Sequence, residues 1–316
     1  MRHTHLLSSL ALALSLTGCQ SLSAGEAVAT VTTVQAPSAA QPIALPNAPD
    51  SLKFCVLGDF GTGSKQQYQL AAQMAELHKT FPFEMCTLVG DNLYGRQRSQ
   101  DFQKKFEIPY KPLLDAEVKF YASLGNHDTR EQRFYKLFNM DGKLYYSFKA
   151  PKQDVRFFAL ETTYPVPEQI KWLEEELMKS REKWKIAYFH HPLYSSAGRH
   201  GSDLQLRETL EPLFTKYGVN VVFTGHDHIY ERIKPQNGIA YFVAGSGGQL
   251  RTGDGRRPAP FSDRIVDSSR VFMVAEISGD RMVFNAVNQL GNIVDSGVVV
   301  RQELSSATGQ SGGERR

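Results

Sequence analysis

The sequence predicts an α/β fold, and two patterns in the chain lead to this prediction. Between residues 53 and 244, short apolar runs that read as buried strands alternate with amphipathic helical stretches, which is typical of βαβ units with helices on both faces of a sheet. From residue 271 onwards the helical pattern stops. Three strand-like runs then follow one another with Gly-Asp and Gly-Asn at the joints, which indicates an antiparallel meander.

Each expected element has its own local signal. Runs of mainly apolar and β-branched residues predict strands at 53–57, 85–89, 120–124, 155–160, 185–189, 219–223 and 239–244, followed by the meander strands at 271–277, 282–288 and 293–300. Apolar residues at helical spacing predict helices at 66–79, 168–178 and 204–217. The last helix is opened by Ser202 or Asp203 as N-cap and is ended by Gly218.

The two ends of the chain differ in composition from the middle. Residues 1–18 have a short basic start and an apolar run too short to span a bilayer, and Cys19 follows Leu-Thr-Gly, which resembles a bacterial lipoprotein signal. An ordinary secretory signal is the alternative. We expect acyl chains on Cys19 to anchor an exported protein, and Gln20 favours the outer membrane of a Gram-negative bacterium, on its periplasmic or surface face. Residues 19–50 read as a flexible Ala/Pro linker, 51–301 as one catalytic domain and 302–316 as a disordered tail.

Charge and composition narrow the classes of function. The chain has 36 Lys and Arg against 33 Asp and Glu, a formal charge of +3, which is too small an excess to predict nucleic acid as a stable partner. Three cysteines are too few for a disulfide scaffold. Cys55 and Cys86 fall inside the first two strands, where we expect free buried thiols, with a disulfide between them as the alternative.

Polar side chains follow five of the strand-like runs, at the point where each run ends. The five loops contain Gly58-Asp59, Gly90-Asp91 with Tyr94, Gly125-Asn126-His127-Asp128, His190-His191 and Gly225-His226-Asp227-His228. Ligands of open α/β sheets bind at the carboxyl ends of the strands. Each loop alone is a common turn, but the ordered set predicts a metal site. The Gly-rich turn at 245–248 is a poor match to a phosphate-cradling loop, because no helical pattern follows it.

The ordered set resembles the calcineurin-like metallophosphoesterases, and within them the purple acid phosphatases. The resemblance covers residues 53–241, and the meander also fits. Most members of the superfamily have a metal-binding His two residues after the first Asp. This sequence has Gly61 there and Tyr94 three residues after Asp91, the exchange that purple acid phosphatases make. A packed loop aromatic is the alternative for Tyr94. The resemblance implies a four-layer α/β/β/α sandwich with two mixed central sheets.

The resemblance also implies two metal ions, Fe(III) with Fe(II), Zn or Mn. Carried over position by position, the family pattern gives two sets of ligands that share Asp91: Asp59, Asp91, Tyr94 and His228 for the first ion, and Asp91, Asn126, His190 and His226 for the second. The family's ligand stands two residues before a Pro, so Pro192 selects His190 over His191. His191 is then expected to be a pocket wall or a packed residue.

The activity implied is a binuclear-metal phosphatase that hydrolyses small phosphate monoesters by attack of a metal-bound hydroxide. His127 is the first candidate for the group that protonates the leaving alkoxide, with Asp128 orienting its ring. His200 is the second candidate, one residue farther from His190 than in the mammalian enzymes of this family. The alternatives are a phosphodiesterase or nucleotide hydrolase on the same metals, and a lipoprotein binding module without activity.

Overall fold

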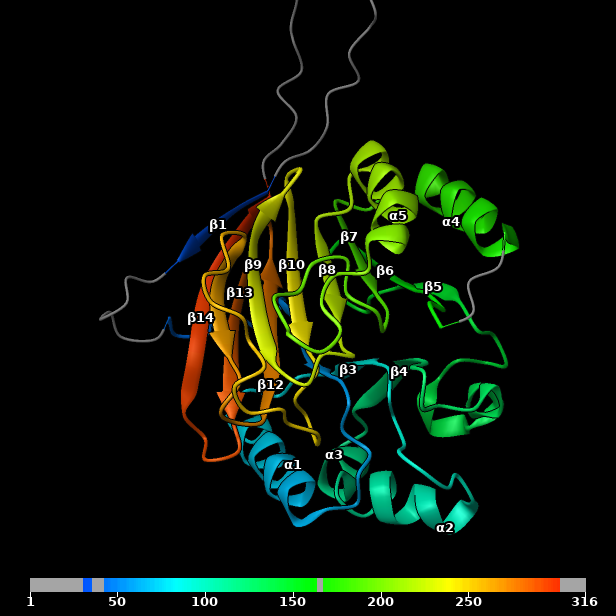
Figure 1. Ribbon diagram of the computed structural model, residues 1–316, viewed down its shortest axis with the longest axis vertical. Helices are drawn as coiled ribbons and strands as arrows, with labels where there is room; N and C mark the ends of the chain where they lie inside the picture. The colour runs from blue at the N-terminus through cyan, green and yellow to red at the C-terminus, as the bar shows by residue number, and fades with distance from the viewer. Residues whose placement is uncertain (1–30, 36–42, 164–166, 302–316) are drawn as a thin grey trace, which may run out of the picture.

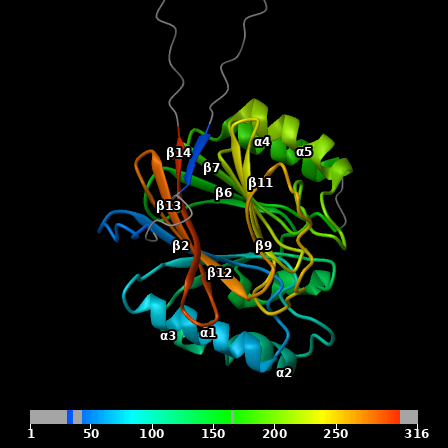
Figure 2. The ribbon, with the colours of Figure 1, turned by 60° about the vertical axis from the view of Figure 1, so that its left-hand side comes forward.

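The computed structural model describes residues 31–35, 43–163 and 167–301. Two seven-stranded sheets lie face to face at its centre. Helices α1 (Lys65–His78), α2 (Ser99–Phe102) and α3 (Lys111–Asp115) lie outside the first sheet, and α4 (Pro167–Lys179) and α5 (Leu204–Tyr217) lie outside the second (Figures 1 and 2). The predicted four-layer α/β/β/α sandwich is confirmed.

The first sheet combines the parallel amino-terminal strands with the meander. Its order is β1 (Val31–Gln35), β14 (Ile293–Arg301), β13 (Arg281–Asn288), β12 (Val271–Ser278), β2 (Leu52–Leu57), β3 (Met85–Val89) and β4 (Lys119–Ser123). Strands β2, β3 and β4 are parallel, whereas β12, β13 and β14 form the expected antiparallel meander and join the sheet through β2. Every residue of β2 and β3 is buried, as expected for strands covered on both faces.

The second sheet is also mixed. Its order is β11 (Ser262–Val266), β9 (Tyr230–Gln236), β10 (Ile239–Ala244), β8 (Val221–Thr224), β7 (Trp184–Tyr188), β6 (Val155–Ala159) and β5 (Tyr146–Lys149). Strands β6, β7, β8 and β10 are parallel, and β5, β9 and β11 pair antiparallel at the two ends of this row. Parallel strands in both sheets therefore bring several carboxyl ends together along one border of the sandwich.

Apolar packing holds the layers together. Most of the buried apolar side chains form one cluster between the two sheets and under α1, and a second cluster fills the space between α4, α5 and the second sheet. The predicted caps of α5 are present, since the Asp203 carboxylate accepts a hydrogen bond from the Leu206 backbone N–H at 2.9 Å and Gly218 adopts a left-handed conformation. Among the described residues, every helix is too short or too polar to cross a lipid bilayer.

Two segments of the stretch expected to be a linker, residues 19–50, pair with the rest of the fold. Within the stretch expected to be a flexible linker, Val31–Gln35 forms strand β1 and pairs with β14, because its β-branched residues favour an extended edge strand. The backbone N–H groups of Asn47 and Ala48 donate to the Glu276 carboxylate at 2.6 and 2.7 Å, so the residues before β2 are also attached to the sheet. The signal peptide, Cys19 and the tail at 302–316 lie outside the described residues.

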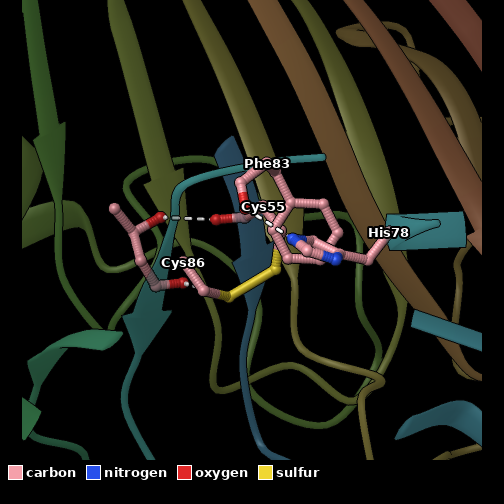
Figure 3. The surroundings of a disulfide bond; sticks show 5 residues. Cys55, His78, Phe83 and Cys86 are labelled. Carbon is pink, nitrogen blue, oxygen red and sulfur yellow. Dashed lines mark hydrogen bonds between the residues drawn. A yellow bond between two sulfur atoms is a disulfide. The ribbon is translucent and has the colours of Figure 1, made fainter. Parts of the chain in front are cut away.

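The expectation of free thiols at Cys55 and Cys86 is wrong, because the two residues form a disulfide (Figure 3). They occupy paired positions on the parallel neighbours β2 and β3, with their Cα atoms 4.4 Å apart, which is within the range that a disulfide needs. Both residues are fully buried, as expected. The crosslink lies four residues before Asp59 and five before Asp91, so it joins the two strands that lead into the candidate site.

Candidate metal centre

The five loops predicted from the sequence meet at one place, at the carboxyl ends of parallel strands from both sheets. Asp59 follows β2 and Asp91 follows β3 in the first sheet, and His190 and His226 follow β7 and β8 in the second. Three of the candidate ligands, Asp59, Asp91 and His226, adopt positive φ angles of 55°, 52° and 69°. Left-handed backbone is unfavourable for such residues, and its concentration at one place is typical of a functional site.

The first group of polar atoms is formed by Asp59, Tyr94 and His228. The Tyr94 Oη atom lies 3.1 Å from Asp59 Oδ1 and 3.2 Å from His228 Nε2, and the latter two atoms are 3.5 Å apart. The Asp59 side chain is fully buried, and its second carboxylate oxygen accepts the His226 backbone N–H at 2.9 Å. Burial, and next the nearby Asp91 charge, raise the pKa of Asp59 well above its usual range.

The second group is formed by Asn126, His190 and His226. The Asn126 Oδ1 atom lies 3.0 Å from both His190 Nε2 and His226 Nδ1, and the two ring nitrogens are 3.1 Å apart. Atoms that bind one metal ion at about 2.1 Å lie roughly 3 Å from one another, so this triangle has a size at which all three atoms could hold one ion. Burial lowers the pKa of His226 to about 2 and that of His190 well below its usual range, which keeps both rings neutral.

Asp91 lies between the two groups. Its Oδ1 is 3.5 Å from His190 Nε2, and it groups with Asp59 and His228 as a set of side chains able to hold a metal ion. Its Oδ1 also accepts the His127 backbone N–H at 2.9 Å, which fixes the carboxylate in place. The Asp91 carboxylate thus lies close to both groups of donor atoms, as a ligand shared by two metal ions requires.

The polar atoms of the second group are arranged to bind a metal ion rather than to hydrogen-bond to one another. His190 Nδ1 lies 3.0 Å from the Val89 carbonyl oxygen, which can only accept, so the ring proton is on Nδ1 and Nε2 carries a lone pair. This lone pair faces the Asn126 Oδ1 at 3.0 Å, which is also an acceptor. Two acceptors at this distance repel unless a cation lies between them. The neutral imidazoles, the amide oxygen and the carboxylates are all ordinary ligands of iron, zinc or manganese.

The glycines before the ligands leave room for ligands of other loops. A Cβ atom at Gly225 would lie 2.4 Å from Asp59 Oδ2, and one at Gly125 would lie 2.3 Å from Asp91 Oδ1. Both distances are far below van der Waals contact. The Gly225-His226 and Gly125-Asn126 pairs therefore reflect close approach between loops as well as turning of the chain.

Family comparison agrees with this geometry. A family model described as calcineurin-like phosphoesterase matches residues 52–230, more than half of the chain. The chain belongs to the calcineurin-like phosphoesterase family. The resemblance drawn from the sequence motifs is thereby confirmed, and the structure contains two groups of side chains that could hold a metal ion, Asp59–Asp91–His228 and His190–His191–His226.

Relatives of this phosphoesterase include acid phosphatases. Purple acid phosphatase 17 of Arabidopsis thaliana is 25% identical over 295 residues, covering 81% of this chain and 87% of the relative. Human tartrate-resistant acid phosphatase type 5 is 28% identical over 252 residues, covering 66% and 77%. Among solved structures, the purple acid phosphatase PPD1 of yellow lupin has a TM-score of 0.66 at 18% identity, covering 80% and 54%. GAP50, described as the anchor in the inner membrane complex of Plasmodium, has a TM-score of 0.70 at 20% identity, covering 81% and 90%.

The two histidines expected to face substrate flank the donor groups of the phosphoesterase on different sides. The His127 ring lies beside Tyr94, 4.8 Å between centroids, with its Nε2 4.0 Å from Asp91 Oδ2 and about half of its side chain exposed. The exposed His200 ring lies 4.2 Å from the His226 ring. The structure thus brings both candidates to the centre, His200 included, despite its additional residue of spacing.

The hydrogen bonds of Asp128 go to other groups than the His127 ring that it was expected to orient. Its carboxylate accepts the backbone N–H groups of Asn92, Leu93 and Gly125 at 2.9–3.0 Å and the Gln132 side-chain amide at 2.6 Å. No hydrogen bond between Asp128 and the His127 ring is among the contacts of the described residues. Asp128 therefore joins the loop of Asp91 and Tyr94 to the loop of Asn126, which positions candidate ligands rather than the His127 ring.

Sequence reasoning missed two residues around the centre. Thr162, just beyond β6, bonds the His191 ring, and its place after a strand end is the signal that would have found it. Asp227 lies between the candidate ligands His226 and His228 and accepts the Gly201 backbone N–H at 3.2 Å, which steadies the loop of His200. The Gly-rich turn at 245–248 uses the N–H groups of Gly247 and Gly248 to bond the carbonyls of Gly58 and Asp59, so it supports the Asp59 loop.

Proposed function

We propose that this phosphoesterase is an exported acid phosphatase that hydrolyses phosphate monoesters with two metal ions. The observation that carries the proposal is the pair of three-atom donor groups, Asp59–Tyr94–His228 and Asn126–His190–His226, on either side of the single carboxylate of Asp91. The names of the related purple and tartrate-resistant acid phosphatases support the choice of monoesters.

Asp59, Asp91, Tyr94 and His228 would hold the first ion, and Asp91, Asn126, His190 and His226 the second. Burial, and next the charges of Asp59 and Asp91, strongly raise the pKa of Tyr94. Only a strongly polarising cation would hold this residue as a phenolate, which favours Fe(III) in the first position. The nitrogen-rich second group suits a divalent ion, Fe(II), Zn or Mn. When bound, such a pair lowers the pKa of water and neutralises charge on a transferring phosphoryl group.

The side chains of the chain itself have two further tasks. His127 and His200 flank the centre and are placed to bind the phosphate or to deliver a proton to the departing alkoxide. Asp128 keeps the loops of Asp91, Tyr94 and Asn126 in register through five hydrogen bonds, which its carboxylate accepts from Asn92, Leu93, Gly125 and Gln132. Small misplacements of such loops reduce rates strongly, so Asp128 acts as a positioning residue.

Metal analysis and visible absorbance test the proposed centre. Protein purified without chelators should contain two metal ions per chain and absorb visible light through a tyrosinate–iron transition. Tyr94→Phe should lose the colour, whereas Tyr68→Phe, whose hydroxyl bonds the Lys104 carbonyl at an exposed position, should keep it. A colourless wild-type protein containing two zinc or manganese ions would reject Fe(III) and keep the phosphoesterase. A chain that binds no metal and gains no activity from iron and zinc would favour a binding role, such as the anchor described for GAP50.

A mono- and a diester of the same chromogenic phenol separate the two enzymatic alternatives. We expect faster hydrolysis of the monoester. Equal or faster hydrolysis of the diester would indicate a phosphodiesterase or nucleotide hydrolase on the same residues, because only the ester groups differ between the substrates.

Export and lipid anchoring form a separate part of the proposal. The lipoprotein-like motif at Cys19 supports it, and so does the buried Cys55–Cys86 disulfide, since such bonds persist in oxidising compartments outside the cytoplasm. In a Gram-negative host, the wild-type chain should sediment with outer membranes, and Cys19→Ser should not. A Cys19→Ser protein that still fractionates with the membrane would argue against the lipid anchor.

A further inference from the structure

His191 is a further imidazole at the centre that the proposed ligand set leaves unused. It follows His190 directly after β7, and its ring centroid lies 4.4 Å from that of His226 and 5.0 Å from that of His190. One nitrogen from each of these three rings lies within 4.8 Å of the others. The residue is therefore part of the histidine cluster, and its hydrogen bonds decide what it does there.

Thr162 holds the His191 side chain at Nδ1. The Thr162 Oγ1 atom lies 2.9 Å from His191 Nδ1 and also accepts the His191 backbone N–H at 3.2 Å. Thr162 is 7% exposed, so its hydroxyl hydrogen needs an acceptor within the protein. The acceptor that the contacts of the described residues provide for it is His191 Nδ1. With Nδ1 accepting, the ring hydrogen of His191 is on Nε2.

The neighbouring histidines thus have opposite tautomers. The Val89 carbonyl places the hydrogen of His190 on Nδ1 and leaves a lone pair at Nε2 for a metal ion. The Thr162 hydroxyl places the hydrogen of His191 on Nε2, and a nitrogen that carries hydrogen has no lone pair to give to a metal. A protonated His191 would also carry hydrogen at Nε2, so this donor is present in either protonation state.

From this geometry we infer that His191 is a substrate-binding residue that donates its Nε2–H to an oxygen of the bound phosphate group. The inference rests on the proposed function, because it needs an anion at the metal centre. An imidazole N–H facing an anionic oxygen forms one of the stronger hydrogen bonds of proteins. Thr162 is the positioning residue that keeps the hydrogen on the correct ring nitrogen.

Inorganic phosphate is the probe for the binding experiment. Its affinity is measured by titration calorimetry on the metal-loaded wild-type protein, His191→Ala and His191→Gln, with the metal content of each protein measured in parallel. His191→Ala should keep two metal ions and bind phosphate about 10- to 100-fold more weakly, the effect of losing a hydrogen bond to a charged group. His191→Gln should recover part of the affinity, because its amide can donate at similar reach. His78→Gln, at the end of α1 and away from the centre, is the matched control and should bind phosphate normally.

Two results of this experiment would overturn the inference. Loss of a metal ion in His191→Ala would make the residue a ligand, and unchanged phosphate affinity would make it a packed wall. A wild-type protein that binds neither metal nor phosphate would instead refute the proposed function, an outcome distinct from a defect confined to the His191 variants.

The tautomer is tested separately by nitrogen-15 NMR of the zinc-loaded protein with labelled histidine. The His191 signals should show hydrogen on Nε2 in the wild type, and Thr162→Val should lose this preference and weaken phosphate binding. Thr162→Ser, which keeps the hydroxyl, should behave as the wild type. A wild-type His191 with hydrogen on Nδ1 would contradict the inference.

Discussion

Replacing Gly225 by alanine should damage the first metal position selectively. The added Cβ would lie 2.4 Å from Asp59 Oδ2 and 2.9 Å from the Val89 carbonyl oxygen, about 1 Å and 0.5 Å inside van der Waals contact at about 3.4 Å. The backbone oxygen on one side prevents the methyl group from moving away, so the Asp59 carboxylate has to shift by about 1 Å. That shift also breaks its hydrogen bond from the His226 backbone N–H.

A displacement of about 1 Å at a catalytic centre lowers rates by about 100-fold, which corresponds to about 2.7 kcal/mol in the activation free energy. Gly225→Ala should therefore lose metal from the Tyr94 side first and show kcat/KM about 100-fold below wild type on a chromogenic aryl phosphate. Metal content, visible absorbance and kcat/KM are measured on the same preparation.

Gly279→Ala is the matched control for the glycine substitution itself. Its Cβ would enter open space, but its φ of +58° makes alanine unfavourable, so it should cost about 1 kcal/mol of stability and leave the metal content intact. If Gly225→Ala kept two metal ions and a wild-type rate, the close approach of the two loops would not matter for the centre, and the reasoning would be refuted.

Three further predictions concern the bridging carboxylate, the disulfide and a partly buried ion pair. Asp91→Asn should weaken both metal ions together and cost more activity than loss of a ligand to one ion, as measured by metal content and kcat. Replacing Cys55 and Cys86 by serine should lower the free energy of unfolding by about 4 kcal/mol in denaturant titrations, since the bond closes a loop with a sequence separation of 31. Burial opposes the ionisation of Glu182, but hydrogen bonds from Arg156 and Ser180 prevail and lower the pKa of Glu182 to about 2. The charge therefore stabilises the fold above pH of about 4, and this contribution disappears as the pH falls towards 2. Glu182→Gln should cost about 1 kcal/mol at pH 7 and nothing near pH 2.

Each of these expectations has an outcome that contradicts it. Loss of a single metal ion in Asp91→Asn would remove the bridging assignment. Unchanged unfolding of the serine variant under oxidising conditions would mean that the two sulfur atoms are not bonded in solution. If Glu182→Gln lowered the free energy of unfolding equally at all pH values, the charge of Glu182 would not be what stabilises the fold.

The strands that carry the site were predictable because they are short, buried and followed by turn residues. Met85–Val89 and Ile239–Ala244 lie at the residues expected, and the ends of the other predicted strands shift by one or two residues. Strand β9 was missed because Glu231, Arg232 and Lys234 look like a loop. In the fold, Arg232 is fully buried and its guanidinium pairs at 2.8 Å with both Asp295 of β14 and Asp263 of β11. Only the assembled sheets provide those partners, so the local sequence could not reveal the strand.

The candidate ligands were predictable for a different reason. Each polar loop alone is a common turn, but five of them in this order, each after a strand, predict a metal site. The environment of each side chain was not predictable. Nothing in the sequence around Asp128 shows that backbone N–H groups from three other residues converge on its carboxylate. His191 and Thr162 are 29 residues apart, and their contact depends on the neighbouring positions of β6 and β7 in the second sheet.

The left-handed backbone at Asp59, Asp91 and His226 sets the candidate metal centre against the stability of the fold. Each of these residues costs the fold about 1–3 kcal/mol relative to a glycine at the same position. Replacing one of these residues by glycine therefore relieves backbone strain, even though it removes a candidate metal ligand. Keeping Asp59, Asp91 and His226 in left-handed backbone therefore lowers stability, a cost that is expected where the side chains themselves are needed.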